Sequence, residues 1–188
     1  MKLAYEKYLQ EILIDSETLQ ARVAELGAEI SADYAERDKL LLICILKGGV
    51  MFLTDLMRHI TLPHEIDFLS VSSYGRGGRS ATGNVRIDMD LKEGITGKNI
   101  LIVEDIIDSG FTLRFVMDML LARQPESIRL CTLLDKPSRR IVEIPVTYTG
   151  FQIEDRFVFG YGLDLDEKFR NLPFIGVVRP ESLSESED

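Results

Sequence analysis

The chain has 188 residues, of which 45% are hydrophobic and 28% are charged, so it is long enough and apolar enough to bury a core as one globular domain. Its formal net charge at pH 7 is −9, which disfavours nucleic acid as a partner because phosphate neutralisation supplies most of that affinity. No apolar run approaches the ~20 residues that cross a bilayer, so we expect no membrane segment.

The opening residues MKLAYEKYLQEILI interrupt their apolar positions with charged and amide side chains, which argues against a secretory signal and favours a cytoplasmic protein. The two cysteines, Cys44 and Cys131, lie inside apolar runs and are predicted to be buried core residues in a reducing compartment. The two histidines, His59 and His64, show no metal-ligand spacing with each other or with a cysteine.

The first half of the chain predicts a helix followed by a strand–helix–strand unit. Apolar residues at helical spacing over positions 19–30 predict an amphipathic helix that begins near Ser16. Residues 40–46 form a continuous apolar run, which is typical of a strand buried on both faces. A second helical stripe covers residues 53–60, and residues 66–73 predict the next strand.

The second half opens with a polar, glycine-rich stretch at residues 74–84. Residues 85–89 then alternate apolar and charged side chains, the pattern of a half-exposed strand. An apolar strand, a helix and another strand follow, at residues 100–103, 113–121 and 128–134. From residue 141 onward the pattern predicts short strands and loops.

Two strand–helix–strand units predict an α/β fold with a mostly parallel, twisted sheet flanked by helices. We expect a single domain over residues 1–188, with a core at about 16–140, a small hood of short strands and loops at about 141–180, and an acidic tail at 181–188. Ligands of open sheets of this kind bind outside the carboxyl ends of the strands. Polar residues that directly follow the predicted strands are therefore the candidates for a site.

The segment after the strand at 100–103 carries the strongest chemical signal. Two adjacent carboxylates, Glu104 and Asp105, end the strand, and a short turn of small and polar residues leads from Asp108 into a helix. Free amides at a helix N-terminus bind anions, helped by hydroxyls and the helix dipole. Carboxylates just upstream would repel a bare phosphate but suit sugar hydroxyls or a magnesium ion. The segment therefore predicts a phosphorylated sugar bound together with a divalent cation.

Residues 103–112 resemble the phosphoribosyl pyrophosphate signature of type I phosphoribosyltransferases, and the motifs around them resemble those of hypoxanthine-guanine phosphoribosyltransferases. These flanking motifs are Leu46-Lys47-Gly48-Gly49, Ser73-Tyr74, residues 133–139, residues 155–158, Asp164 and Arg170. The resemblance covers most of the chain between residue 40 and about residue 175. It implies the type I phosphoribosyltransferase fold, Mg²⁺ as cofactor, and a homodimer or homotetramer. The implied reaction transfers phosphoribosyl from phosphoribosyl pyrophosphate to N9 of hypoxanthine, and also of guanine, in purine salvage.

The resemblance also implies a role for each matching residue. Asp108 would be the catalytic proton acceptor and donor near purine N7. Glu104 and Asp105 would hold the ribose hydroxyls and, together with Asp164, magnesium. The 5′-phosphate would be held by amides and hydroxyls of Asp108, Ser109, Gly110, Phe111 and Thr112. Phe111 departs from the family, which commonly has Lys or Asn there, so this position is expected to contribute only its amide.

Pyrophosphate and purine would be bound by residues from other segments. The implied pyrophosphate site comprises Lys47, Gly48 and Arg170, and the Leu46–Lys47 peptide is cis in the family. The implied purine site comprises Lys136, Phe157, Val158 and Asp164. In it Lys136 would donate to the exocyclic O6, Phe157 would stack on the ring, and the Val158 backbone would read the ring edge.

A lid is expected over this site, because water would intercept an oxocarbenium-like electrophile. The glycine-rich residues 74–84 fit such a lid, and the resemblance transfers only to its first residue, Tyr74, and to the preceding Ser73.

Three other protein classes share part of this sequence pattern. A nucleotide-binding P-loop has the glycine spacing of residues 78–83, but Asn84 and Val85 replace the Lys and Ser/Thr that it requires. A phosphoacceptor receiver domain would need another strand between Asp105 and Lys136, and the interval is too short. A regulator that senses phosphoribosyl pyrophosphate and binds nucleic acid is disfavoured by the net charge and by the complete set of implied purine-binding residues.

Overall fold

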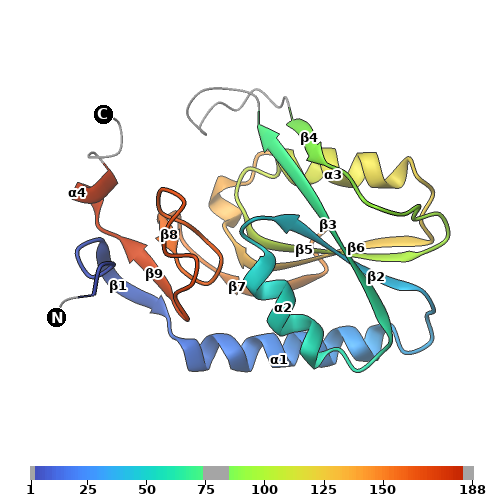
Figure 1. Ribbon diagram of the computed structural model, residues 1–188, viewed down its shortest axis with the longest axis horizontal. Coiled ribbons are helices and arrows are strands. Elements are labelled where there is room, and N and C mark those ends of the chain that lie inside the picture. Colours follow the sequence, from blue (N-terminus) through green and yellow to red (C-terminus); the bar gives the residue numbers. More distant parts are fainter. Residues whose placement is uncertain (1–2, 74–84, 184–188) are drawn as a thin grey trace.

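A six-stranded sheet runs through the centre of the computed structural model, which describes residues 3–73 and 85–183 (Figure 1). In spatial order its strands are β4 (Val85–Met89), β3 (His64–Ser73), β2 (Leu40–Leu46), β5 (Asn99–Ile107), β6 (Ser127–Asp135) and β7 (Tyr148–Gln152). All neighbours are parallel except β4, which pairs antiparallel with β3. The predicted α/β fold with a mostly parallel sheet is confirmed.

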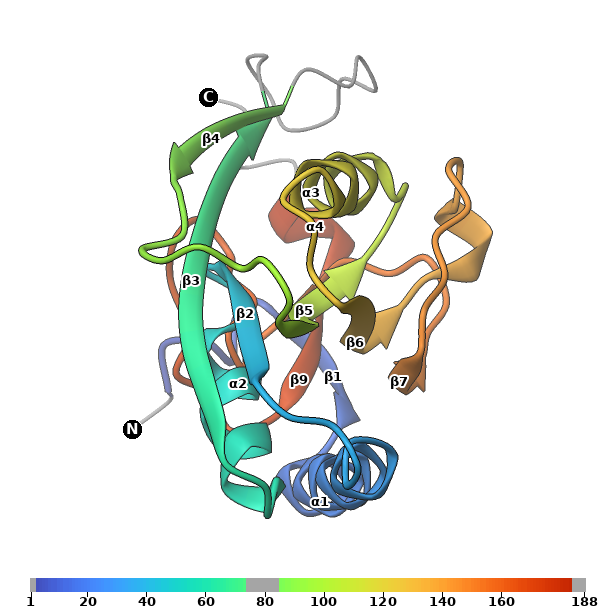
Figure 2. The ribbon, with the colours of Figure 1, turned by 90° about the vertical axis from the view of Figure 1, so that its right-hand side faces the viewer.

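Helices cover both faces of this sheet, as Figure 2 shows. The helices α1 (Ser16–Asp33) and α2 (Val50–His59) lie on one face, and α3 (Phe111–Leu121) lies on the other. In β2, Leu42 and Cys44 pack with α1 and α2, whereas Ile43 packs with α3. The apolar run of β2 is therefore buried on both faces, as its sequence predicts.

Both cysteines are free and buried, as expected from their apolar surroundings. Burial raises the pKa of the Cys44 thiol to about 12 and raises that of Cys131 as well, so both side chains are neutral, small core residues. Within the described residues, no helix is long and apolar enough to span a membrane.

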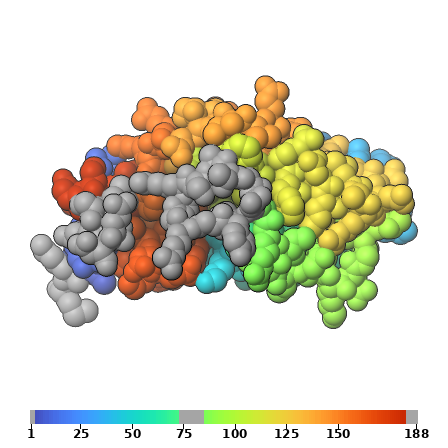
Figure 3. Space-filling model, turned by 90° about the horizontal axis from the view of Figure 1, so that it is seen from above, coloured from blue at the N-terminus to red at the C-terminus, as the bar shows by residue number. Residues whose placement is uncertain are grey.

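A second, smaller sheet forms the hood beside the carboxyl ends of the main strands. It has the order β1 (Leu9–Ile14), β9 (Ile175–Val178) and β8 (Val158–Phe159), with antiparallel pairing throughout. A separate apolar cluster supports it, formed by Phe159, Leu165, Leu172, Phe174 and Val178. Figure 3 shows the orange and red hood segments at one end of the molecule and the yellow helix α3 toward the other.

The boundaries of core and hood differ from the expectation in two places. The main sheet does not end at residue 140, because β7 pairs in parallel with β6 and extends it. The hood in turn takes β1 from the first residues of the chain, a strand that the sequence pattern does not indicate. The short helices are the 3₁₀ turn η1 (Pro137–Arg139) and α4 (Pro180–Leu183), so residues 181–183 of the expected tail are helical. The expected lid at 74–84 lies outside the described residues.

Candidate active site

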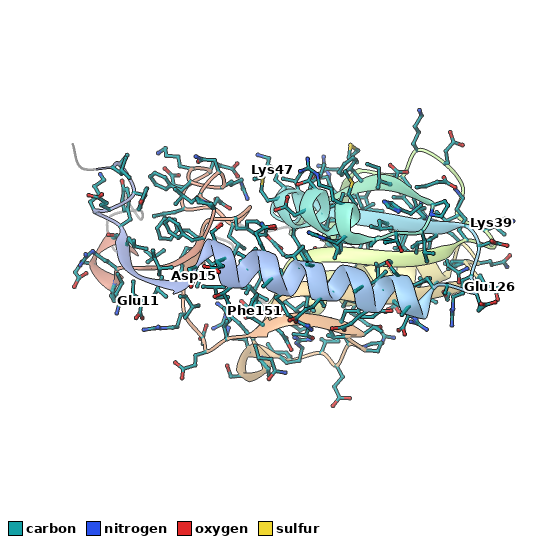
Figure 4. All side chains as sticks on the ribbon, turned by 90° about the horizontal axis from the view of Figure 1, so that it is seen from below. Glu11, Asp15, Lys39, Lys47, Glu126 and Phe151 are labelled. Atoms are coloured by element: carbon teal, nitrogen blue, oxygen red, sulfur yellow. The ribbon has the colours of Figure 1, made fainter. Side chains whose placement is uncertain are left out.

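The predicted site residues that follow or end the main strands, among them Lys47, Asp105 and Lys136, lie at the hood-facing end of the sheet. In Figure 4, Lys39 and Glu126, which precede β2 and β6, lie at one end of the sheet, and Lys47, which follows β2, lies toward the hood. The carboxyl ends of the parallel strands therefore point at the hood. This is the edge at which ligands of such sheets bind.

Glu104 and Asp105 lie within β5, which is longer than its apolar run predicts and continues to Ile107. Burial raises the pKa of Glu104 well above its ordinary value, and the adjacent charge of Asp105 adds to this effect. Burial likewise raises the pKa of Asp105 to about 6, although its Oδ1 accepts a 2.8 Å hydrogen bond from the Ile106 amide. Oε2 of Glu104 is buried and has no hydrogen-bond partner within the described part of the chain.

These two carboxylates fit a magnesium ion that is shared with a substrate. Their oxygens are hard ligands, and a cation would relieve both the unpartnered oxygen of Glu104 and the raised pKa of Asp105. Over residues 3–73 and 85–183, no group of three or more His, Cys, Asp or Glu side chains is arranged to hold a metal. Magnesium is commonly bound by one or two carboxylates together with water and substrate phosphates, and such a site needs no larger protein cluster.

The loop after β2 lies between the end of β5 and the hood loop that contains Gly162. The Leu46–Lys47 peptide is cis, as the resemblance implies, and it leads into Gly48. A Cβ atom on Gly48 would collide with Oδ2 of Asp105, so only glycine allows this approach. Gly162, with φ of +99°, in turn packs its backbone against the carbonyl of Gly48. The loop after β2 is thus in direct contact with both the end of β5 and the hood loop.

Lys47 and Arg170, the two cations implied for pyrophosphate, are bridged by one acidic side chain of the hood, Glu167. Lys47 Nζ lies 2.8 Å from Oε2 of Glu167, and both side chains are exposed. Arg170 Nη2 lies 2.9 Å from Oδ1 of Asp164 and 3.3 Å from Oε1 of Glu167. Arg170 also lowers the pKa of Asp105, while Asp164 raises it, so both charges act on the Asp105 carboxylate.

The turn from Asp108 to Gly110 leads into α3 as the sequence predicts. Gly110 precedes the first helical residue with φ of +91°, and no side chain caps the helix. The carbonyl oxygen of Ser109 accepts the amides of Ile141 and Val142 at 3.0 Å, which fixes the turn against the chain after β6. The first amides of α3 are therefore left without a capping side-chain oxygen to satisfy them.

Asp108 is tied to the segment after β6 by ion pairs. Arg139 donates from Nε to Oδ1 of Asp108 at 2.9 Å, and it also reaches Oδ2 of Asp155 at 3.4 Å. Lys136 is 7% exposed, and its Nζ lies 3.6 Å from Oδ1 of Asp155. Asp108, the implied base, and Lys136, the implied O6 donor, are thus the two ends of a chain of ion pairs that runs through Arg139 and Asp155. The sequence does not indicate a role for Arg139.

The hood exposes an aromatic side chain, Phe157, two residues after Asp155. Phe157 is 47% exposed, although its neighbour Val158 is buried in β8. The Phe157 carbonyl accepts the Val178 amide at 2.9 Å, so its backbone is fixed while the ring remains accessible. Ser73 ends β3, and Tyr74 lies outside the described residues. The structure thus brings together strand-end and hood residues, and leaves the expected lid contact of Tyr74 undescribed.

Comparisons with known proteins agree with this geometry. The phosphoribosyl transferase domain family matches residues 10–168. Hypoxanthine phosphoribosyltransferase of Salmonella typhimurium is 49% identical over 173 residues, covering 92% of this chain and 97% of its own. The Haemophilus influenzae enzyme of the same name is 50% identical over 175 residues, with the same two coverages. This chain belongs to the hypoxanthine phosphoribosyltransferase family.

The solved fold of this family matches as well. The crystal structure of a hypoxanthine phosphoribosyltransferase from Staphylococcus aureus has a TM-score of 0.91 at 43% identity, and it covers 97% of this chain and 98% of its own. The predicted resemblance and type I phosphoribosyltransferase fold are confirmed. The alternative of a nucleic-acid-binding regulator finds no support in these hypoxanthine phosphoribosyltransferases.

Proposed function

We propose that this chain transfers the 5-phosphoribosyl group from phosphoribosyl pyrophosphate to N9 of hypoxanthine, and also of guanine, releasing pyrophosphate. One observation carries the proposal: the half-buried carboxylate pair of Glu104 and Asp105, whose pKa values are raised, and the N-terminal turn of α3 follow each other at the end of β5. The pair suits ribose hydroxyls, and the amides of the turn suit the 5′-phosphate. Family membership at about half sequence identity supports the same reaction.

The leaving group requires cations. Displacing pyrophosphate from the anomeric carbon builds positive charge on the ribose and negative charge on the departing oxygens. Lys47 and Arg170 approach the same point from β2 and the hood, and positive charge fixed there in advance would stabilise the departing oxyanion. A magnesium ion that Glu104 and Asp105 would hold, and a second one that Asp164 would face, would neutralise further charge on the substrate's oxygens.

The nucleophile requires a base. As purine N9 attacks, the ring loses a proton, and a carboxylate near N7 can take it. Asp108 is half exposed at the turn, where its oxygens lie at the surface rather than in the core. A positioned base of this kind contributes ~10²–10⁴-fold to the rate.

The purine requires a polar edge and an apolar face. Lys136 is nearly buried and keeps its ammonium group beside Asp155, where it can donate to a 6-oxo group. Phe157 offers an accessible ring for stacking, and the backbone of Val158 can read the opposite ring edge. An exocyclic amino group at position 6 would offer Lys136 a donor instead of an acceptor. The site therefore favours 6-oxopurines.

An absorbance assay tests this proposal. Hypoxanthine, guanine and xanthine are each mixed with phosphoribosyl pyrophosphate and magnesium, and nucleotide formation is followed. We expect turnover with hypoxanthine and with guanine, and none without magnesium. Calorimetry with phosphoribosyl pyrophosphate and magnesium, but no base, reports donor binding separately. No turnover with any base, together with no heat of donor binding, would overturn the proposal.

We also propose that the enzyme is cytoplasmic and forms a homo-oligomer. Two buried free thiols suit the reducing cytoplasm, and the family resemblance implies a homodimer or a homotetramer. Light scattering after size-exclusion chromatography measures the molar mass of the assembly. A mass equal to that of one chain at working concentrations would contradict the expected oligomer.

A further inference from the structure

We infer that Glu167 is a resident counter-anion for Lys47 and Arg170, which pyrophosphate must displace when it binds. The inference rests on the proposed function, because it takes these two cations as the pyrophosphate site. It adds a residue that sets the affinity for the leaving group.

The contacts of Glu167 are those of an anion held between two cations. One carboxylate oxygen, Oε2, lies 2.8 Å from Lys47 Nζ, and the other, Oε1, lies 3.3 Å from Arg170 Nη2. An exposed glutamate that contacts two cations carries its negative charge at neutral pH. A diphosphate group that engages the same two cations would meet this carboxylate already in contact with both.

Glu167 is also held in place by a tight turn. Leu165 and Lys168 exchange two backbone hydrogen bonds of 3.1 Å, which leaves Asp166 and Glu167 as the two central residues. Their φ angles are +53° and +58°, the combination that a two-residue hairpin of type I′ requires. The Glu167 amide donates to Oδ2 of Asp164 at 2.9 Å, which fixes the turn to the hood loop.

The residue type at this position is unfavourable for the turn. Type I′ turns favour Asn-Gly and Asp-Gly, so Asp166 suits the first central position and glycine would suit the second. A glutamate in the left-handed region is uncommon because its Cβ crowds the backbone. Backbone preference therefore does not explain Glu167, whereas its contacts with both cations give the side chain a role.

The role follows from competition. Exposed ion pairs are individually weak, so a carboxylate can hold the two cations in the free enzyme and still yield to a multiply charged diphosphate. Its displacement lowers the affinity for pyrophosphate, and the same carboxylate re-forms its pairs as the product leaves. Glu167 thus keeps the product from remaining on the enzyme.

The test is calorimetry of pyrophosphate with magnesium, together with product inhibition by pyrophosphate, in Glu167→Gln. We expect pyrophosphate to bind about two- to fivefold more tightly, because two weak competing pairs are removed. The KM for hypoxanthine should not change. Glu167→Gly, which removes the carboxylate and suits the turn, should show the same tightening with a melting temperature at or above that of the wild type.

The matched control is Asp166→Asn. It removes the same unit of charge at the adjacent turn position, but Asp166 pairs with Lys168 at 2.8 Å and with neither of the two cations. Equal tightening in Asp166→Asn would reduce the effect to net charge and overturn the inference. Unchanged or weaker pyrophosphate binding in Glu167→Gln would also overturn it. A wild-type enzyme that neither binds pyrophosphate nor transfers phosphoribosyl would instead refute the proposed function.

Discussion

The guanidinium of Arg139 contacts both oxygens of the Asp108 carboxylate, with Nε 2.9 Å from Oδ1 and Nη2 3.4 Å from Oδ2. Both side chains are about half exposed, so water competes for the pair and it is readily exchanged. Each carboxylate oxygen can accept a second hydrogen bond, so a purine N7–H can bind Asp108 while Arg139 still holds it. In the proposed reaction, the base is therefore held in a defined orientation before the purine arrives.

Replacing Asp108 tests its role as the base. Asp108→Asn should lower kcat by ~10²–10⁴-fold, because the amide cannot accept the purine proton. Binding of phosphoribosyl pyrophosphate should change little, because backbone amides of the turn hold the 5′-phosphate. Steady-state kinetics and calorimetry measure the two effects. Asp118→Asn, an exposed carboxylate of α3 paired with Arg114, is the control and should retain activity. Undiminished turnover in Asp108→Asn would remove this residue from its role.

Replacing Lys136 tests recognition of the 6-oxo group. Lys136→Met keeps much of the side-chain volume but removes the donor, and kcat/KM for hypoxanthine should fall by about 10- to 100-fold. The matched control is Lys98→Met, because Lys98 is also largely buried and pairs with Glu65 at 2.7 Å, at the opposite end of the sheet. Equal activity of the two variants would argue against the contact with O6.

The close approach of Gly48 to Asp105 makes a steric prediction. Gly48→Ala places a Cβ against Oδ2 of Asp105, so the carboxylate must move and kcat/KM for phosphoribosyl pyrophosphate should fall by about 10²-fold. Gly94→Ala is the control, since a Cβ at Gly94 meets no atom within 4 Å. A Gly48→Ala enzyme as active as Gly94→Ala would show that the carboxylate position is not critical.

The raised pKa values of the carboxylate pair predict a pH-dependent stability of the ligand-free protein. Between the ordinary value of 3.8 and about 6, folded Asp105 binds more protons than unfolded Asp105, so stability falls as pH rises through this window. Glu104 shifts in the same direction. Asp105→Asn should therefore melt at a higher temperature than the wild type at about pH 8, and the difference should shrink at about pH 4.5.

Thermal melting over pH measures this effect, with Asp118→Asn as the surface control. Asp164 raises the pKa of Asp105 and Arg170 lowers it. Burial is the largest influence, so the net shift of this pKa is upward. A difference in melting temperature that grows as the pH falls would contradict the assignment of a buried, destabilising charge to Asp105.

The central strands were predictable because burial on both faces leaves a continuous apolar run. The bounds of β2 follow directly from its sequence. For β5 the apolar run indicates only the first part, since the strand continues through Glu104 and Asp105 to Ile107. These two carboxylates interrupt the apolar pattern because they lie at the end of the strand that faces the site.

The bounds of β1 and β7 could not be predicted from hydrophobic patterning. Of the residues of β1, only Ile14 is buried, and the strand pairs on one side alone, so neither alternation nor a long apolar run is needed. β7 is short and contains Gly150, which strand preferences disfavour. The structure requires that glycine, because a Cβ there would collide with the carbonyl of Leu133 on β6.

For the candidate site, the rule that ligands bind at strand ends predicts that Lys47, Asp105 and Lys136 lie at one edge of the sheet. Contacts between distant loops had no such signal. Lys47 and Glu167 are 120 residues apart, and only the packing of the hood against the sheet brings them together. The pairing of Arg139 with Asp108 depends likewise on how η1 folds back over the turn.

The antiparallel pairing of β1 with β9 has a consequence for the order of folding. Strand β1 begins at Leu9 and β9 at Ile175, so their pairing joins segments that are far apart in the chain. All six strands of the main sheet lie between Leu40 and Gln152. Closing a longer loop costs more chain entropy, so the main sheet can form first and the hood sheet afterwards.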